Sequence, residues 1–88
     1  MEVRYSSKAL HDIELWKKSG QKQSQKKIQA LISSIESSPY SGIGSPEQLK
    51  YELSEYWSRR IDKANRIIYK VVDDAIFIYS LRGHYLDK

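Results

Sequence analysis

The sequence has no cysteine, and its apolar runs are short. Without cysteine the chain can form neither a disulfide nor a thiolate metal site. No apolar stretch approaches the roughly 20 residues that a membrane-spanning helix needs. Residues 1–5 also lack the apolar core of a signal peptide. We therefore expect a cytoplasmic protein that makes no contact with a membrane.

Proline and glycine are scarce, and their positions indicate how the chain is organised. Both prolines and two of the four glycines fall within residues 38–46. We interpret this segment as a structured loop and not as a linker, because neither flank is long enough to fold alone. The 88 residues are therefore predicted to form a single domain, 1–88, near the lower end of comfortable domain size.

The net charge is +4, with 15 lysines and arginines against 11 aspartates and glutamates. This excess favours a polyanionic partner such as a nucleic acid. The first half of the chain is rich in lysine, whereas all arginines except Arg4 lie in the second half. Because the planar fork of arginine suits phosphate oxygens better than a lysine point charge, a phosphate-binding site is expected in the second half.

The first half has the apolar spacing of two helices. We predict amphipathic helices over residues 7–18 and 21–37, joined by a turn at Ser19-Gly20, with Ser6 or Ser7 capping the first and Pro39 ending the second. The apolar positions that recur three or four residues apart are Ala9, Leu10, Ile13 and Trp16, then Ile28, Leu31, Ile32 and Ile35.

The remaining segments have the pattern of β-strands. We predict strands over residues 1–6, 48–53, 56–61, 66–72 and 75–81. Asp73-Asp74 marks a tight turn, so the last two strands should pair antiparallel at the centre of the sheet. The predicted fold is α+β in the order β-α-α-β-β-β-β. It consists of an antiparallel strand meander with a helical hairpin packed on one face.

Polar residues beside these strands form a candidate site. A carboxylate, an imidazole and several cations are enough to cleave RNA without a metal. A base takes the 2′-hydroxyl proton, arginines neutralise the phosphoryl charge, and an acid protonates the leaving 5′-oxygen. No metal or cofactor is expected, because cysteine is absent and the two histidines, His11 and His84, are far apart in sequence. The candidates are Glu47, Lys50, Arg59, Arg60, Arg66, His84 and Tyr85.

Each of these residues also has a simpler interpretation when taken alone. Glu47 at a junction between loop and strand is typical of a solvated charge, and a lone histidine such as His84 is more often structural. Arg66 opens a central strand and therefore needs an anionic partner, which an ion pair would supply. The carboxylates available for that ion pair are Asp62, Glu55 and Asp73.

Arg59 and Arg60 are neighbours in a predicted strand, so their side chains point to opposite faces of the sheet. If Trp57 and Ile61 mark the core face, Arg59 lies along the edge of that face. Arg60 then projects from the other face. We therefore keep Arg60 in the candidate site and leave Arg59 out.

The order of these residues resembles the YoeB/Txe group of toxins in the RelE superfamily. The resemblance covers nearly the whole chain, and its most specific parts are the Trp-Ser-Arg-Arg-Ile segment and the late His-Tyr pair. The motifs that carry it are Pro46-Glu47-x-Leu49-Lys50, Leu53-Ser54-x-x-Trp57-Ser58-Arg59-Arg60-Ile61, Asn65-Arg66-Ile67-Ile68-Tyr69 and His84-Tyr85.

The resemblance implies a RelE-like fold and the toxin of a bacterial type II toxin–antitoxin pair. Such a toxin is a ribosome-dependent endoribonuclease that cuts mRNA in the A site and stops translation. By motif position, the resemblance makes Glu47 the general base, His84 the general acid and Arg66 the main phosphate ligand. The residues that it implies for binding and orienting RNA are Lys50, Arg60 and Tyr85.

The resemblance also implies partners. These are the 70S ribosome with its mRNA and rRNA, and a cognate antitoxin of the YefM/Phd type whose C-terminal segment folds over the toxin. Toxin–antitoxin complexes of this kind commonly bind and repress their own operator DNA, and the toxins often form homodimers.

The sequence departs from the family pattern in three places. Ser45-Pro46-Glu47-Gln48 stands where Lys-Pro-Glu-Pro is frequent, Asn65 replaces a frequent histidine, and Leu86-Asp87-Lys88 follow the His-Tyr pair. Two other functions stay open. One is a catalytically weak interaction module that acts with its antitoxin as an operator-binding co-repressor. The other is a stand-alone RNA-binding domain, which would need stacking aromatics on an exposed sheet face.

Overall fold

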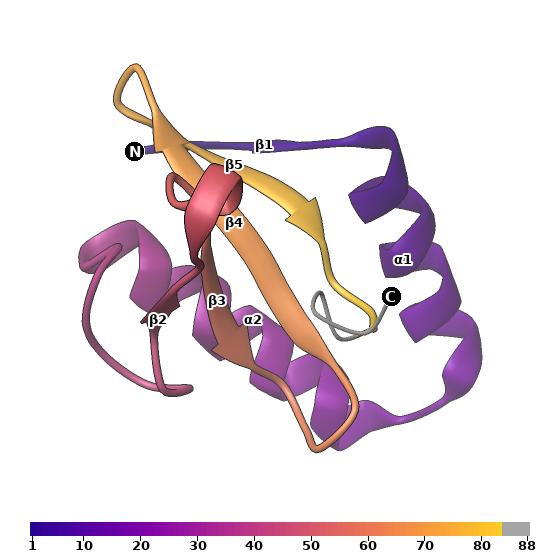
Figure 1. Cartoon of the computed structure of the whole chain (residues 1–88). Coiled ribbons are helices and arrows are strands. Elements are labelled where there is room, and N and C mark those ends of the chain that lie inside the picture. Colours follow the sequence, from indigo (N-terminus) through magenta and orange to yellow (C-terminus); the bar gives the residue numbers. More distant parts are fainter. Residues whose placement is uncertain (84–88) are drawn as a thin grey trace.

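A five-stranded sheet lies at the centre of the computed structural model, which describes residues 1–83 (Figure 1). The strands are ordered β1-β5-β4-β3-β2. β1 runs parallel to β5 and the other neighbours are antiparallel, so the sheet is mixed. The predicted α+β order is confirmed. The elements are β1 (Glu2–Tyr5), α1 (Ser7–Ser19), α2 (Lys22–Ser37), β2 (Glu47–Gln48), the 3₁₀-helix η1 (Tyr51–Leu53), β3 (Trp57–Arg60), β4 (Arg66–Val72) and β5 (Ala75–Ser80).

The ends of α1 are set by local chemistry. The Oγ atom of Ser6 accepts a hydrogen bond from the Ala9 amide at 2.9 Å, which satisfies one of the free donors in the first turn. Gly20 ends the helix in the left-handed conformation, with φ of 70°. Both helices match the predicted ranges to within a residue or two. Neither helix is long and apolar enough to cross a membrane, as judged from residues 1–83.

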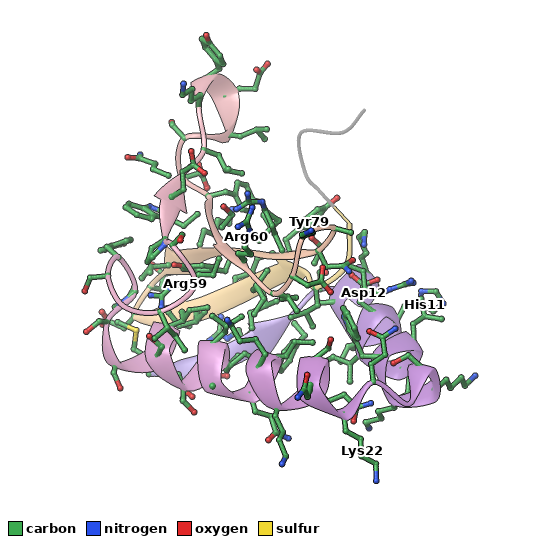
Figure 2. The ribbon with its side chains drawn as sticks, turned by 90° about the horizontal axis from the view of Figure 1, so that it is seen from below. His11, Asp12, Lys22, Arg59, Arg60 and Tyr79 are labelled. Carbon is green, nitrogen blue, oxygen red and sulfur yellow. The ribbon has the colours of Figure 1, made fainter. Side chains whose placement is uncertain are left out.

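The hydrophobic core lies between the helices and one face of the sheet. In Figure 2, α2 runs below the sheet and parallel to its plane. The side chains of β4 and β5 that face the helices alternate with side chains that face away, as expected for strands packed on one side. The fully buried residues of this core include Ala9, Leu31, Ile35, Ile67, Tyr69, Ile76 and Ile78.

The predicted strand over residues 48–53 is wrong in its extent. Only Glu47–Gln48 pairs with β3, and the chain then turns into η1. Tyr51 adopts a positive φ of 60°, which breaks an extended backbone. The buried Leu49 is anchored by its amide, which donates to the Tyr56 carbonyl at 2.9 Å. Leu49 is the one residue of 48–53 that is buried, so the segment lacks the alternation of buried and exposed side chains that a strand needs, and it folds as a turn.

The β4–β5 hairpin closes where the sequence predicts it. Asp73 and Asp74 have φ of 50° and 62°, the backbone that a two-residue hairpin turn requires. Further along, a bulge shifts the register, because Tyr69 pairs with Ile78 whereas Ile68 pairs with Ser80. Tyr79 is the extra residue in β5, and it changes which side chains at the end of β5 share a face with those of β4.

The end of β5 is fixed by α1. The Leu81 amide donates to Oδ2 of Asp12 at 2.9 Å, and the Leu81 carbonyl accepts from Nε1 of Trp16 at 2.8 Å. Asp12 is only 3% exposed, and its carboxylate also accepts from Lys8 at 2.8 Å. Both backbone groups of Leu81 are therefore satisfied by side chains of one helix.

A second attachment follows two residues later, at Gly83. Its amide donates to Oδ1 of Asn65 at 2.8 Å, and its carbonyl accepts from the Arg66 amide at 3.1 Å. Asn65 is itself held by Asp62, whose Oδ1 accepts from the Asn65 amide at 2.8 Å and from its Nδ2 at 3.0 Å. The β3–β4 connection thus fixes the chain up to residue 83 beside the start of β4.

We expect Asp12→Ala to lower the free energy of unfolding by about 1–3 kcal/mol, because it leaves the buried Leu81 amide without an acceptor. Urea denaturation of both proteins measures this difference. The control is Glu14→Ala on the same helix, where the carboxylate is exposed and forms only a surface pair with Lys17, so the change should stay within about 0.5 kcal/mol. Equal losses for the two variants would contradict the attachment of Leu81 by Asp12.

We expect Asn65→Ala to loosen the chain at Gly83 without unfolding the core. Loss of one hydrogen bond, about 1 kcal/mol, should speed exchange of the Gly83 amide roughly fivefold. Hydrogen exchange followed by NMR measures this rate, with the Leu81 amide as an internal reference. Lys63→Ala, an exposed change in the same connection, should leave the rate unchanged. An unaltered Gly83 rate in Asn65→Ala would show that Asn65 does not hold this segment.

Candidate active site on the outer face of the sheet

The face of the sheet away from the helices carries the predicted site residues that lie on strands. We call it the outer face and define it by Glu47, Ser58, Arg60, Arg66 and Ile68. Glu47 in β2 pairs with Ser58 in β3, and Ser58 pairs with Ile68 in β4. Residues directly opposite each other share a face, so Glu47 stands on the outer face at the edge of the sheet.

Arg60 and Arg66 are direct cross-strand neighbours on this face. Within residues 1–83 neither guanidinium has an ion pair or a side-chain hydrogen bond. Like charges directly opposite each other are unfavourable in a sheet. Two adjacent guanidinium groups without a counter-ion from the described part of the chain have the chemistry to bind an anion such as phosphate.

The ion pair considered for Arg66 is not formed, because the nearby carboxylates serve other groups. Oδ1 of Asp62 accepts hydrogen bonds from the backbone amides of Ala64 and Asn65, both at 2.8 Å. Glu55 pairs with Lys70 at 2.9 Å, and this hydrogen bond raises the pKa of Lys70. Neither Asp62 nor Glu55 therefore neutralises the guanidinium of Arg66.

Lys50 lies three residues beyond Glu47, at the start of η1. Its side chain is exposed, and no residue among 1–83 pairs with its ammonium group. The exposed ammonium could reach a polyanion bound beside β2.

His84 and Tyr85 lie outside the described residues. The chain that leads to them is placed, because the Gly83 carbonyl accepts from the Arg66 amide. The described chain therefore ends at residue 83, beside the start of β4. Glu47 lies two strands away from β4 in the other direction, about 10 Å at the usual strand spacing. Arg66 thus lies between the β2 edge and the chain that continues to His84.

Arg59 is a residue whose importance the sequence analysis missed. We predicted that it would lie along the edge of the core face, but it is 0% exposed. Figure 2 shows Arg59 and Arg60 on opposite sides of the sheet, with Arg59 between the sheet and α2. The parity that Arg59 shares with Trp57 and Ile61 indicated the core face. The missed signal is the neighbouring loop rich in glycine and serine, whose backbone groups need partners.

Within residues 1–83 no group of three or more histidine, aspartate or glutamate side chains is arranged to hold a metal ion. The charged groups among the five residues that define the outer face are one carboxylate and two guanidiniums. Such a set can accept a proton and neutralise a phosphoryl group.

Comparison with known proteins gives the family. Residues 5–85 match the model of the YoeB-like toxin of bacterial type II toxin–antitoxin systems. Toxin YoeB of Streptomyces coelicolor is 42% identical over 85 residues, which cover 97% of this chain and 100% of the relative.

Solved structures agree with this match. The YoeB/ParE toxin from Agrobacterium tumefaciens is 31% identical, covers 97% of this chain and 100% of its own, and superposes with a TM-score of 0.91. YoeB from Staphylococcus aureus is 37% identical over 97% of this chain and 98% of its own. It is known as a dimer, with a TM-score of 0.85, and in a heterotetrameric complex with the antitoxin YefM, with a TM-score of 0.84. The chain therefore belongs to the YoeB family of toxins of bacterial type II toxin–antitoxin systems.

Proposed function

We propose that this toxin is a ribosome-dependent endoribonuclease that cleaves mRNA in the A site and thereby inhibits translation. The observation that carries the proposal is the pair of neighbouring arginines, Arg60 and Arg66, on the outer face, which forms no ion pair with any of residues 1–83. Glu47 stands on one side of this couple, and the chain to His84 leaves from the other side. A phosphodiester bound to the couple would lie between a base and an acid.

The reaction follows from these roles. Glu47 takes the proton of the 2′-hydroxyl, whose oxygen attacks the adjacent phosphorus. Arg66 neutralises the charge that grows on the non-bridging oxygens. His84 gives a proton to the 5′-oxygen as its bond to phosphorus breaks. The products are a 2′,3′-cyclic phosphate and a free 5′-hydroxyl, and the side chains supply both proton transfers, so the scheme needs no metal.

The remaining site residues bind and orient the RNA in this proposal. Arg60 shares the phosphate with Arg66, because the two are cross-strand neighbours. Lys50 attracts the RNA backbone beside β2 as an exposed point charge. Tyr85, next to the proposed acid, offers an aromatic ring on which a base can stack.

The family also suggests the partners. We propose a cognate antitoxin of the YefM/Phd type, which is supported by the complex of the Staphylococcus aureus relative with YefM. The solved dimer of that relative supports a homodimer. The further partners in the proposal are the 70S ribosome with its mRNA and rRNA, and operator DNA bound through the toxin–antitoxin complex in the cytoplasm.

We expect Glu47→Gln and His84→Gln each to slow cleavage of A-site mRNA by about 10²-fold or more, because each removes one proton transfer. The measurement is the single-turnover rate on programmed ribosomes with the toxin in excess. The matched control is His11→Gln, which changes the exposed histidine of α1 and should cleave at the rate of the unaltered toxin. Absence of cleavage over a range of codons, or undiminished cleavage by His84→Gln, would refute the assignment.

Arg66→Lys keeps the charge but removes the planar fork. We expect the single-turnover rate to fall by about 10²-fold, since the loss concerns stabilisation of the transition state. Arg4→Lys is the control, because Arg4 lies on the edge strand β1 and forms a surface pair with Glu2; its rate should not change. The role of Arg66 is wrong if both variants cleave alike.

Expression in a bacterial host distinguishes the enzyme from a co-repressor with weak catalysis. The unaltered chain should arrest growth, and co-expression of its antitoxin should restore it. Tight antitoxin binding without growth arrest would favour the co-repressor.

A further inference from the structure

We propose that Arg59 is a positioning residue for the cleavage reaction. Its buried guanidinium holds the loop of residues 38–45, and this loop fixes Glu47 at the edge of the outer face. The inference rests on the proposed function, because it concerns the carboxylate to which that function gives the role of base.

The guanidinium of Arg59 uses every hydrogen-bond donor that an arginine has, five in all. Its acceptors come from three parts of the chain, namely α2, the loop after it, and β4. The loop alone supplies three carbonyls, so it wraps around the guanidinium. The contacts are Nε to the Tyr69 hydroxyl at 3.1 Å, Nη1 to Ser34 Oγ at 2.7 Å and to the Ile43 carbonyl at 3.1 Å, and Nη2 to the carbonyls of Ser38 at 2.6 Å and Ser41 at 2.8 Å.

All the acceptors of Arg59 are neutral oxygens, since none of its hydrogen bonds goes to a carboxylate. The arrangement depends on the shape of the fork, which points donors in fixed directions within one plane. A lysine in its place has the same charge but only three donors on one atom. Arg59→Lys therefore separates the effect of geometry from that of charge.

Tyr69 extends the network to the start of the loop. Its hydroxyl accepts from Nε of Arg59 and donates to the Pro39 carbonyl at 2.6 Å. Burial raises the pKa of Tyr69, an effect that outweighs the lowering by the neighbouring Arg59. The hydroxyl is therefore protonated at neutral pH and can serve as the donor to Pro39.

The loop packs closely against α2 and β3. A Cβ atom on Gly42 would lie 2.5 Å from Ser34 Oγ, and one on Gly44 would lie 2.5 Å from Cδ2 of Leu31. Both glycines also have positive φ, of 119° and 84°. The Gly44 carbonyl accepts from the Arg60 amide at 2.7 Å. The loop is thus joined to β3 by its backbone as well as by the Arg59 side chain.

Glu47 depends on this loop because its own strand is short. β2 contains only Glu47 and Gln48, and a two-residue strand makes few ladder hydrogen bonds. The nearest anchor after it is the Leu49 amide, which donates to the Tyr56 carbonyl. Before it, the anchor is the loop held by Arg59. A shift of the loop by about 1 Å would move the carboxylate, and a displacement of that size can cost about 10²-fold in rate.

The test is a double-mutant cycle that combines Arg59→Lys with Glu47→Gln. Single-turnover cleavage is measured on programmed ribosomes with the toxin in saturating excess, at a temperature where all variants are folded. Arg59→Lys alone should slow cleavage by about 10²-fold. In that background, Glu47→Gln should cost less than about threefold, because the base is already displaced. The same factor for Glu47→Gln in both backgrounds would overturn the proposal.

A second cycle provides the control. The chain to His84 is held by the separate attachments at Leu81 and Gly83. His84→Gln should therefore cost the same factor with and without Arg59→Lys. Ile28→Ala, a core change in α2 away from the loop, serves as the variant with reduced stability, and Glu47→Gln should keep its full cost in it. Loss of that cost in Ile28→Ala would mean that any destabilised toxin shows the effect.

A measurement without ribosomes separates this inference from the proposed function. In Arg59→Lys, hydrogen exchange should speed up at least fivefold at the amides of Arg60 and Leu49, which report on the loop and on β2. The Leu81 amide, bonded to Asp12, should keep its rate. If the unaltered toxin cleaves no mRNA, the proposed function is wrong. Unchanged hydrogen exchange at the amides of Arg60 and Leu49 in Arg59→Lys would refute the positioning role, whatever the cleavage assay shows.

Discussion

A buried cation that has only neutral acceptors among residues 1–83 is the constraint on which much of this structure depends. Removing a guanidinium from water costs several kcal/mol. Arg59 offsets this cost with five hydrogen bonds, each of the charge-assisted kind that is worth about 1.5–3 kcal/mol. The loop of residues 38–45 is mostly small and polar, so it cannot stabilise itself by apolar packing, and its carbonyls need donors. The donors of the Arg59 guanidinium and the carbonyls of the loop therefore satisfy each other's hydrogen-bonding needs.

The alternation of β3 lets one strand serve two purposes. Arg59 points towards α2 and organises the loop from inside, while Arg60 points outward beside Arg66 (Figure 2). A shift of one residue in the register would exchange the two side chains, placing an unpaired guanidinium in the core. The Arg59 network and the hydrogen bond from the Arg60 amide to Gly44 both oppose that shift. The same contacts that stabilise the interior thus determine which arginine lies on the outer face.

The sequence predicted those parts of the fold that follow from local patterns. Helical spacing gave both helices, and Asp73-Asp74 gave the hairpin turn, because capping and turn chemistry act over a few residues. The short extent of β2 was not predictable, since the sequence pattern does not show that Tyr51 adopts a positive φ and turns the chain into η1. Nor was the full burial of Arg59, whose acceptors lie up to 25 residues away in the chain.

Two like charges lie side by side on the outer face, an arrangement that a bound anion would relieve. Arg60 and Arg66 are opposite each other on the adjacent strands β3 and β4, where like charges repel. The pair two residues along the same strands, Ser58 and Ile68, is buried and keeps the two backbones in place. An RNA phosphate placed between the guanidiniums would remove this repulsion. Because the sheet holds the two arginines in place before binding, little ordering cost would remain when an anion binds. The proposed reaction uses no metal, so it would depend on such preorganisation of the side chains. The two sides of the arginine pair are held separately, the Glu47 side by the loop around Arg59 and the Gly83 side by α1 and the β3–β4 connection.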